Sequence, residues 1–195
     1  MSTSMGSAIE PARRAKTDQG VFGMALVVFV EVMLFAGFLS AYMIARSSVA
    51  PGLWPPPDQP RLPVERTLLN TAALIVSGIV LYLTQRAATR RGIASVGPGL
   101  FATLAFGAFF VGFQGIEWAG LLRQGFTLTS SQLGAFFYVI IGAHALHAVA
   151  ALIGLVACVV RLRAARLTPS FLGAAALFWY FVVAVWPFLY WQVYL

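Results

Sequence analysis

Cysteine and charge are both scarce in this chain of 195 residues. Its single cysteine, Cys158, excludes a disulfide framework, a thiolate zinc site and an iron–sulfur cluster, which all need several thiolates. Only 10% of the residues are charged and 60% are hydrophobic, against roughly 25% and 45–50% in soluble domains. A soluble fold of this length cannot hide so much apolar surface. We therefore expect a membrane protein.

Acidic residues are the scarcer of the two charge types. The chain has 13 Lys and Arg against 6 Asp and Glu, which gives a formal net charge of +7. These charges fall in short clusters between long apolar runs, so they do not form the continuous basic surface that nucleic-acid binding requires. We expect no nucleic acid as a partner.

Five long runs contain no charged residue or only one. A helix needs about 20 apolar residues to cross a hydrocarbon layer roughly 30 Å thick, and continuous apolar runs favour helices over barrel strands. The sequence therefore predicts an all-α integral membrane bundle in one domain, residues 19–195. Residues 1–18, which are rich in Ser, Ala and charge, are predicted to form a disordered cytoplasmic tail. The five predicted transmembrane helices are 19–45, 66–87, 98–123, 132–161 and 170–194.

The basic residues also predict an orientation. The N-terminus and the loops after the second and fourth helices lie on one side of the membrane, and nine basic residues lie there. The opposite side has four: Arg46, Arg61, Arg66 and Arg123. Because basic residues are enriched in cytoplasmic loops, we expect a cytoplasmic N-terminus and a C-terminus outside.

Two acids, two histidines and one glutamine stand out inside the predicted spans, where such groups are costly. They are Glu31, Gln114, Glu117, His144 and His147. Gln114 and Glu117 are three residues apart and share a helix face, as do His144 and His147. Glu31 and His144 each lie roughly 18 Å into their helices, at about 1.5 Å per residue. They would meet at matched depth if the first and fourth helices are neighbours.

Each of these polar residues has two interpretations. Glu31 is either a proton-exchanging or partner-binding carboxylate, or a structural acid that locks helix packing. For the histidines, interhelical hydrogen bonding is favoured over metal or haem ligation, because two histidines on one helix face cannot take opposite axial positions of one haem. A metal ion would need further ligands, and only Glu31 and Glu117 are available. Gln114 and Glu117 are interpreted as packing residues. We expect no catalytic, cofactor-binding or metal-binding residue.

Aromatic and proline residues supply the candidates for packing and for an interface. Successive prolines cannot lie in a helix interior, so 54–57 is predicted to be a rigid outer connection packed on the bundle. The candidate packing residues are Trp54, Pro55, Pro56, Pro57, Trp179, Tyr180 and Trp186.

Five segments, spread from the first span to the last, share their order with motifs of one family. They read VEVMLFAGF (30–38), WPPP (54–57), QGIEW (114–118), GAHALH (142–147) and WYFVVAVW (179–186). In this order they resemble cytochrome c oxidase subunit III, and the five-span count is similar to that of its short bacterial form. Two positions depart from the family pattern: Tyr180 stands in place of a histidine and Val183 in place of an aspartate.

The resemblance implies a function. It implies an accessory, non-redox subunit of a respiratory haem–copper oxidase in the bacterial cytoplasmic (inner) membrane. This subunit packs on the catalytic subunit, in a complex that includes the electron-entry subunit. Haem and copper are expected in those partner subunits, and phospholipid is expected on this chain. The family subunit supports proton uptake and turnover stability during oxygen reduction. Glu31, Glu117, His144 and His147 match acids and paired histidines of the family.

Ligand counting agrees with a non-redox role, since two histidines and one cysteine are too few for two haems and a copper centre. The alternatives are an accessory subunit of a nitric oxide reductase or quinol oxidase, or an assembly factor. A stand-alone proton channel or transporter is disfavoured, because no inverted repeat is evident.

Overall fold

The computed structural model describes residues 9–49 and 64–194, with side chains described from Gln19 onward. Within these ranges the chain is a helical bundle without strands, and five of its helices are long and apolar enough to cross a membrane. The expected all-α membrane fold is therefore confirmed. The elements are α1 (Ile9–Ser47), α2 (Val64–Arg91), the short 3-10 helix η1 (Ile93–Val96), α3 (Gly97–Arg123), α4 (Gln132–Arg163) and α5 (Pro169–Tyr194).

Helix α1 begins well before the predicted start of the first span. Residues 9–18, which the sequence assigned to a disordered tail, are helical and continuous with the apolar span. Pro11 falls in the first turn of the helix, where a residue without a backbone N–H loses no hydrogen bond. The Ala, Arg and Lys residues that follow are good helix formers, so extending an existing helix through them costs little. Residues 1–8 and the predicted 54–57 connection lie outside the described residues.

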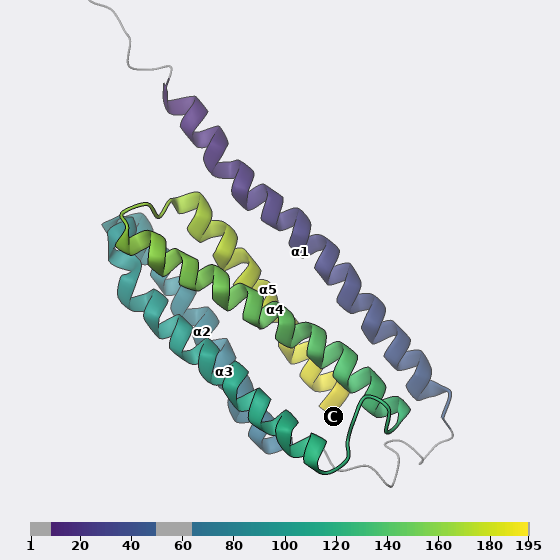
Figure 1. Ribbon diagram of the computed structural model, residues 1–195. Helices are drawn as coiled ribbons and strands as arrows, with labels where there is room; N and C mark the ends of the chain where they lie inside the picture. The colour runs from purple at the N-terminus through teal and green to yellow at the C-terminus, as the bar shows by residue number, and fades with distance from the viewer. Residues whose placement is uncertain (1–8, 50–63, 195) are drawn as a thin grey trace, which may run out of the picture.

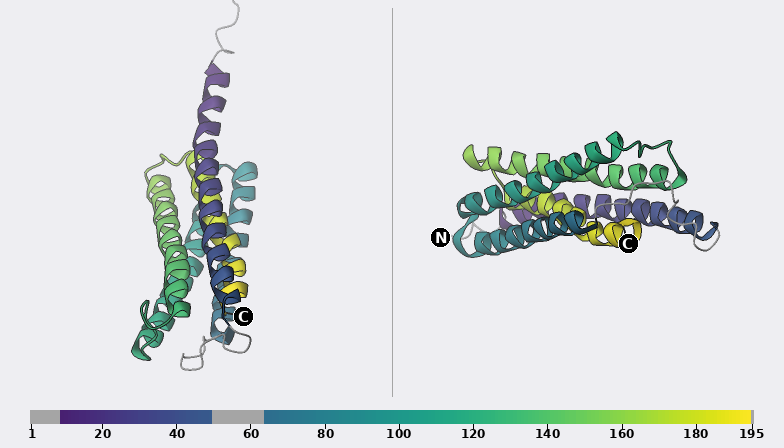
Figure 2. Two further views of the ribbon diagram at one scale, coloured as in Figure 1. Left: turned by 90° about the vertical axis from the view of Figure 1, so that its right-hand side faces the viewer. Right: turned by 90° about the horizontal axis from the view of Figure 1, so that it is seen from below.

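Helix α5 occupies the middle of the bundle. It packs against α1, α2 and α4, while α3 packs against α2 and α4. Helices α2 and α3 lie side by side, and α1 lies on the opposite edge against α5 and α4 (Figure 1). The N-terminal part of α1 extends beyond the ends of the other helices (Figure 2). The last helix of the sequence therefore connects the outer helix to the rest of the bundle.

Side-chain hydrogen bonds join α5 to α2 along their shared seam. The Trp186 indole N–H donates to Thr71 Oγ1 at 2.8 Å, and that of Trp179 donates to Ser77 Oγ at 3.1 Å. Tyr190 donates to the Val64 carbonyl at 3.1 Å and Tyr180 to Gln85 Oε1 at 2.6 Å. Both tryptophans are fully buried, and each buried N–H needs such a partner in a medium without water. The hydroxyls of α2 thus fix the position of α5.

Glycines set the close approach of α3 to its neighbours. A Cβ added at Gly99 would overlap the Thr84 side chain of α2. A Cβ at Gly107 would lie 2.7 Å from atoms of both Trp179 and Leu152. Small residues at such crossings let helix backbones approach closely, which strengthens packing where lipid offers no hydrophobic driving force.

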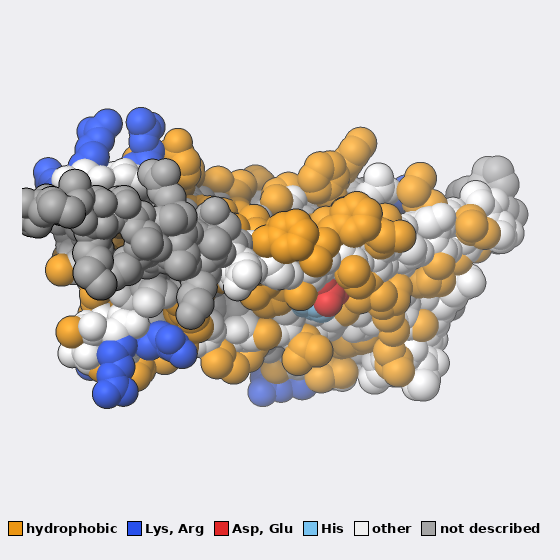
Figure 3. Space-filling model, turned by 90° about the horizontal axis from the view of Figure 1, so that it is seen from above, with side chains coloured by type: hydrophobic (Ala, Val, Ile, Leu, Met, Phe, Trp, Pro, Cys, Tyr) orange, Lys and Arg blue, Asp and Glu red, His pale blue; other side chains and the backbone are white. Residues whose placement is uncertain are grey.

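The outer surface of α1 is apolar and largely uncovered. Its most apolar stretch is only 6% buried, against 44% for α2. Phe22, Phe29, Val30, Met33 and Ile44 are among its exposed side chains. Hydrophobic side chains cover much of the described surface in Figure 3, with basic side chains mainly toward one end. Such a surface suits contact with lipid or with another membrane subunit.

Candidate functional site

Glu31 of α1 lies beside His147 of α4. On α4, His144 precedes His147 by about one helix turn. The His147 Nε2 atom is 2.9 Å from Glu31 Oε2, and the two side chains are 14% and 24% exposed. This distance is short enough for an ion pair. The Glu31 Oε2 atom nevertheless has no hydrogen bond of suitable geometry among the described residues. Helices α1 and α4 are therefore neighbours at this depth, and the polar partner of Glu31 is His147.

The His147 ring has a fixed orientation. Its Nδ1 lies 2.7 Å from the Ala143 carbonyl oxygen on the preceding turn. Because a carbonyl oxygen only accepts, we assign the proton to Nδ1, which leaves Nε2 toward Glu31. A neutral imidazole then presents its unprotonated Nε2 to the Glu31 carboxyl group. The pair therefore brings an acidic and a basic side chain within 2.9 Å of each other.

Aromatic rings surround the Glu31–His147 pair. The His147 ring centroid lies 5.4 Å from that of Phe35 and 6.0 Å from those of Phe178 and Phe181. Phe35 is 2% exposed, so it excludes solvent from the inner side of the pair. A carboxyl and an imidazole in such surroundings interact strongly, because the local dielectric is low.

His144 forms no hydrogen bond with Glu31 and is more deeply buried than His147. It is 1% exposed and packs against the rings of Trp186, Phe110 and Phe35, at centroid distances of 4.9, 6.1 and 6.3 Å. Neither of its ring nitrogens has a hydrogen-bond partner among the described protein groups. The two histidines of α4 therefore share a helix face but occupy different environments.

Gln114 belongs to a buried polar network that joins three helices. Its Nε2 donates to the Tyr194 hydroxyl of α5 at 3.0 Å. Its Oε1 accepts from Asn70 Nδ2 of α2 at 3.4 Å, and Asn70 also donates to the Phe110 carbonyl at 3.1 Å. This network fixes the C-terminal end of α5 against α2 and α3.

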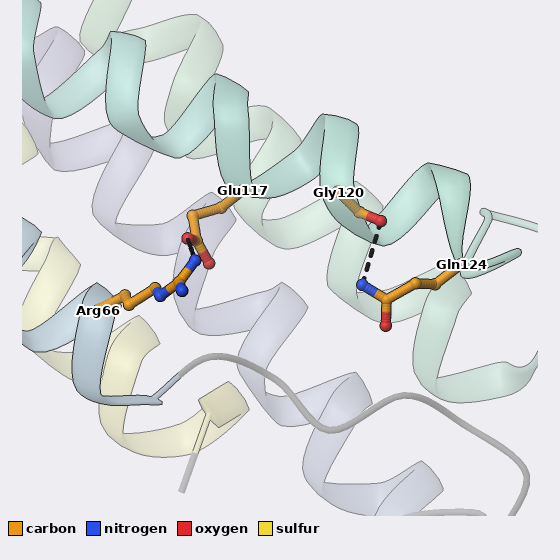
Figure 4. Close-up of polar contacts among 4 residues, drawn as sticks. All are labelled: Arg66, Glu117, Gly120 and Gln124. Atoms are coloured by element: carbon orange, nitrogen blue, oxygen red, sulfur yellow. Dashed lines mark hydrogen bonds and ion pairs between the residues drawn. The ribbon is translucent and has the colours of Figure 1, made fainter.

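Glu117 does not join that network, although it lies one turn from Gln114. It is 8% exposed and pairs with Arg66 of α2, whose side chain is 76% exposed, at 3.8 Å. Figure 4 shows Glu117 reaching from α3 toward the start of α2, while Gln124 folds back to donate to the Gly120 carbonyl at 3.2 Å. Because Arg66 is so exposed, this pair contributes little to stability.

The two departures from the family pattern both face α2. Tyr180 is bonded to Gln85, and a Cβ at Gly78 would lie 3.1 Å from Val183. Trp179 and Trp186 are the buried anchors of the α2–α5 seam. A hydrogen bond and an apolar contact therefore occupy the two positions at which the resemblance implies a histidine and an aspartate.

The sequence interpretation missed several partners of these residues. Thr71, Ser77, Asn70, Gln85 and Tyr194 were not singled out, because hydroxyl and amide residues are common in membrane helices. The spacing of the polar residues along α2 could have indicated that they share one buried helix face. The buried polar residues of α2 follow one another at spacings of three, one, six and seven residues and share one helix face: Thr67, Asn70, Thr71, Ser77 and Thr84.

Candidate metal ligands do not gather in the part of the chain that the structure describes. No three His, Cys, Asp or Glu side chains there come together in a way that could hold a metal ion. Cys158 of α4 is buried and is a free cysteine. That haem and copper belong to other subunits remains a prediction.

A double-mutant cycle on the Glu31–His147 pair should reveal coupling. We expect Glu31→Leu and His147→Leu each to destabilise the chain by about 1–3 kcal/mol, because each leaves a half-buried polar partner unpaired. The double variant should lose less free energy of unfolding than the two single variants together, and the difference, the coupling energy, should be roughly 0.5–3 kcal/mol. Unfolding in mild detergent, followed by near-ultraviolet circular dichroism, measures all four proteins. Additive losses would show that the contact is energetically silent.

Replacing Gln114 with leucine should loosen the end of α5. The change removes a donor to Tyr194 and an acceptor from Asn70, and both groups are buried. We expect the free energy of unfolding to fall by about 1–3 kcal/mol, because two buried hydrogen bonds are lost while Asn70 keeps its bond to the Phe110 carbonyl. Replacing the exposed Gln124 with leucine is the matched control and should change stability by less than about 0.5 kcal/mol. Equal stability of the two variants would contradict the role of the network.

Comparison with known proteins identifies relatives over nearly the whole chain. The family model described as "Cytochrome c oxidase subunit III" matches residues 4–195. A protein of Nocardia farcinica named "Probable cytochrome c oxidase subunit 3" is 31% identical over 194 residues, covering 97% of this chain and 95% of its own length. Cytochrome c oxidase subunit 3 of Equus caballus is 34% identical and that of Latimeria chalumnae 35%, each over 182 residues. Each of these two alignments covers 89% of this chain and 68% of the relative.

Proposed function

The chain belongs to the cytochrome c oxidase subunit III family, and we propose that it is the accessory, non-redox subunit of a bacterial respiratory haem–copper oxidase. The observation that carries this proposal is the match to the family over residues 4–195. In this function the chain packs on the catalytic subunit, and the haem and copper centres reside in the catalytic and electron-entry subunits. The chain lies in the cytoplasmic membrane with its N-terminus inside.

A groove between α1 and α5 supports phospholipid binding by this subunit. It has a volume of about 460 Å³. Its lining includes Val32, Phe35, Leu177 and Phe188, and also Tyr180, whose hydroxyl is hydrogen-bonded to Gln85 of α2. A volume of this size and chemistry suits acyl chains of a phospholipid rather than a polar ligand. We propose that a lipid occupies this groove and stabilises α1 against the bundle.

The Glu31–His147 pair supports a contribution to proton uptake and turnover stability. It is an exchangeable acid and base within hydrogen-bonding distance, in an otherwise apolar region. Intramembrane ionisable groups of this kind are costly and are typical of functional sites. We propose that the pair helps to keep the catalytic subunit supplied with protons during turnover.

Purification in a mild detergent tests subunit membership. A tagged chain should be recovered from native membranes with a haem-containing partner at a one-to-one ratio. Recovery of the chain alone would favour a transporter, and its presence only in immature complexes would favour an assembly factor. The visible spectrum of the intact complex then distinguishes an oxidase from a nitric oxide reductase.

Replacing Glu31 tests the contribution to turnover. We expect Glu31→Ala to leave the initial rate of oxygen reduction unchanged and to shorten the active lifetime of the complex severalfold. Glu31→Gln retains the shape of the side chain and separates loss of the acid from loss of packing. An unchanged lifetime in both variants, at unchanged complex stability, would contradict a role in turnover.

A further inference from the structure

A hollow with charges of both signs lies at the end of the bundle where α2 begins and α3 ends. It is open to the surroundings and has a volume of about 280 Å³. Arg66 lines it from α2, and Glu117, Arg123 and Gln124 line it from the end of α3. The groove between α1 and α5, in contrast, is lined almost wholly by apolar side chains. This hollow therefore suits a different chemical group from that of the α1–α5 groove.

The charges around the hollow are only weakly satisfied within the protein. Arg66 and Glu117 approach to 3.8 Å, and their side chains are 76% and 8% exposed (Figure 4). A guanidinium group has five N–H donors, so Arg66 keeps donors for a ligand. Arg123 is exposed and forms no ion pair with any residue that the structure describes. Two cationic groups and one carboxylate therefore border an open space.

One face of α3 leads from this hollow toward the middle of the helix. Phe109, Phe113, Ile116, Gly120 and Arg123 follow one another at spacings of four, three, four and three residues, so they share a face. Phe109 and Ile116 are 53% and 72% exposed. A Cβ at Gly120 would meet no described atom within 4 Å. The face is apolar within the span and cationic at the helix end, which is the order of acyl chain and head group in a phospholipid.

We propose that this hollow binds the head group of a phospholipid that carries both a phosphate and a primary ammonium group, as phosphatidylethanolamine does. Arg66 and Arg123 donate to the phosphate oxygens, because guanidinium groups form charge-assisted hydrogen bonds with phosphate. Glu117 accepts from the ammonium group. The acyl chains lie along Ile116 and Phe109. A quaternary ammonium has no N–H to donate to Glu117, and a head group without a cation gives this carboxylate no new partner.

The inference goes beyond the proposed function. It requires only that the helices cross a membrane, because the head groups of the bilayer then lie at the level of the helix ends. It also concerns a different part of the bundle from the α1–α5 groove, since none of the residues that line the hollow lines that groove. Failure of one lipid site would therefore leave the other standing.

Native mass spectrometry of the full chain tests the proposal. The chain is purified in a mild detergent and titrated with phosphatidylethanolamine, phosphatidylcholine or phosphatidylglycerol, all with the same acyl chains. We expect phosphatidylethanolamine to bind at least threefold more tightly than either of the other two lipids. Soluble glycerophosphoethanolamine, which has the same head group without acyl chains, should not displace it at equal concentration.

Variants assign the binding to the hollow. The double variant Arg66→Gln, Arg123→Gln should weaken phosphatidylethanolamine binding at least threefold, and Glu117→Gln should remove the preference over phosphatidylcholine. Arg46→Gln is the matched control, because Arg46 is an exposed arginine in the last turn of α1 and does not line the hollow. Ala36→Trp narrows the α1–α5 groove, which Ala36 lines. Both of these variants should retain the preference, and near-ultraviolet circular dichroism checks that every variant is folded.

Three results would overturn the proposal. The first is equal binding of the three lipids by the wild type. The second is a preference that survives in the Arg66, Arg123 and Glu117 variants or disappears in Ala36→Trp, which would assign it to the α1–α5 groove. The third is displacement of the lipid by glycerophosphoethanolamine at equal concentration, which would make the ligand a soluble phosphate ester.

Discussion

Replacing Gly107 with leucine is expected to prevent α3 from packing against α4 and α5. Even a methyl group at this position would lie 2.7 Å from Trp179 and from Leu152. Trp179 cannot move aside easily, because it is fully buried and donates to Ser77 of α2. Overpacking by single methylene groups costs roughly 1–3 kcal/mol, and leucine adds four carbons. We expect a loss of at least about 3 kcal/mol, enough to unfold a marginally stable bundle.

Gly112 provides the matched control for this prediction. It lies on the same helix, is exposed, and a Cβ there would meet no described atom within 4 Å. Gly112→Leu should therefore retain the near-ultraviolet circular dichroism of the wild type in detergent, and Gly107→Leu should lose it. Normal folding of Gly107→Leu would mean that α3 does not approach α5 as closely as described.

Trp186 is the second position at which a large loss is expected. Its ring packs against Phe110 and His144, each at a centroid distance of 4.9 Å, and its indole donates to Thr71. Truncating a buried tryptophan to alanine typically costs about 3–5 kcal/mol, and Thr71 additionally loses a donor. Trp186→Phe keeps most of the apolar contact. Its free energy of unfolding should therefore be about 1–2 kcal/mol higher than that of Trp186→Ala.

Trp191 separates the effect of burial from that of removing a tryptophan. It lies on the same helix but is 62% exposed. Thermal unfolding in detergent should therefore rank the variants Trp191→Ala, Trp186→Phe and Trp186→Ala from most to least stable. Equal midpoints for Trp191→Ala and Trp186→Ala would contradict the assignment of Trp186 as an anchor of the seam.

The spans could be predicted from the sequence because charge is excluded from the bilayer. The predicted spans 98–123 and 132–161 differ from α3 and α4 by at most two residues at each end. Helix α2 extends further than predicted, to Arg91, and ends where Gly92 adopts a φ of 85°. The start of α1 at Ile9 could not be predicted, because a charged segment joined to a stable helix can remain helical while lying outside the apolar core.

The contacts of the polar residues could be predicted only in part. Counting residues along each helix placed Glu31 and His144 at matched depth on the condition that the first and fourth helices are neighbours, and the structure has these two helices in contact near Glu31. Depth alone does not decide which histidine faces the acid, since this depends on the rotation of α4 about its axis. The buried Phe35 ring packs against the rings of both histidines, with His147 toward Glu31 and His144 inside the bundle. This packing depends on three helices at once.

The most direct test of the central claim is to remove this chain from the purified oxidase and measure where the metals remain. We predict that all haem and copper stay with the other subunits, that the remaining complex keeps its initial rate of oxygen reduction, and that the separated chain shows no haem absorbance. Haem or copper recovered at one equivalent with the separated chain would contradict the claim that this subunit is accessory and carries no redox centre.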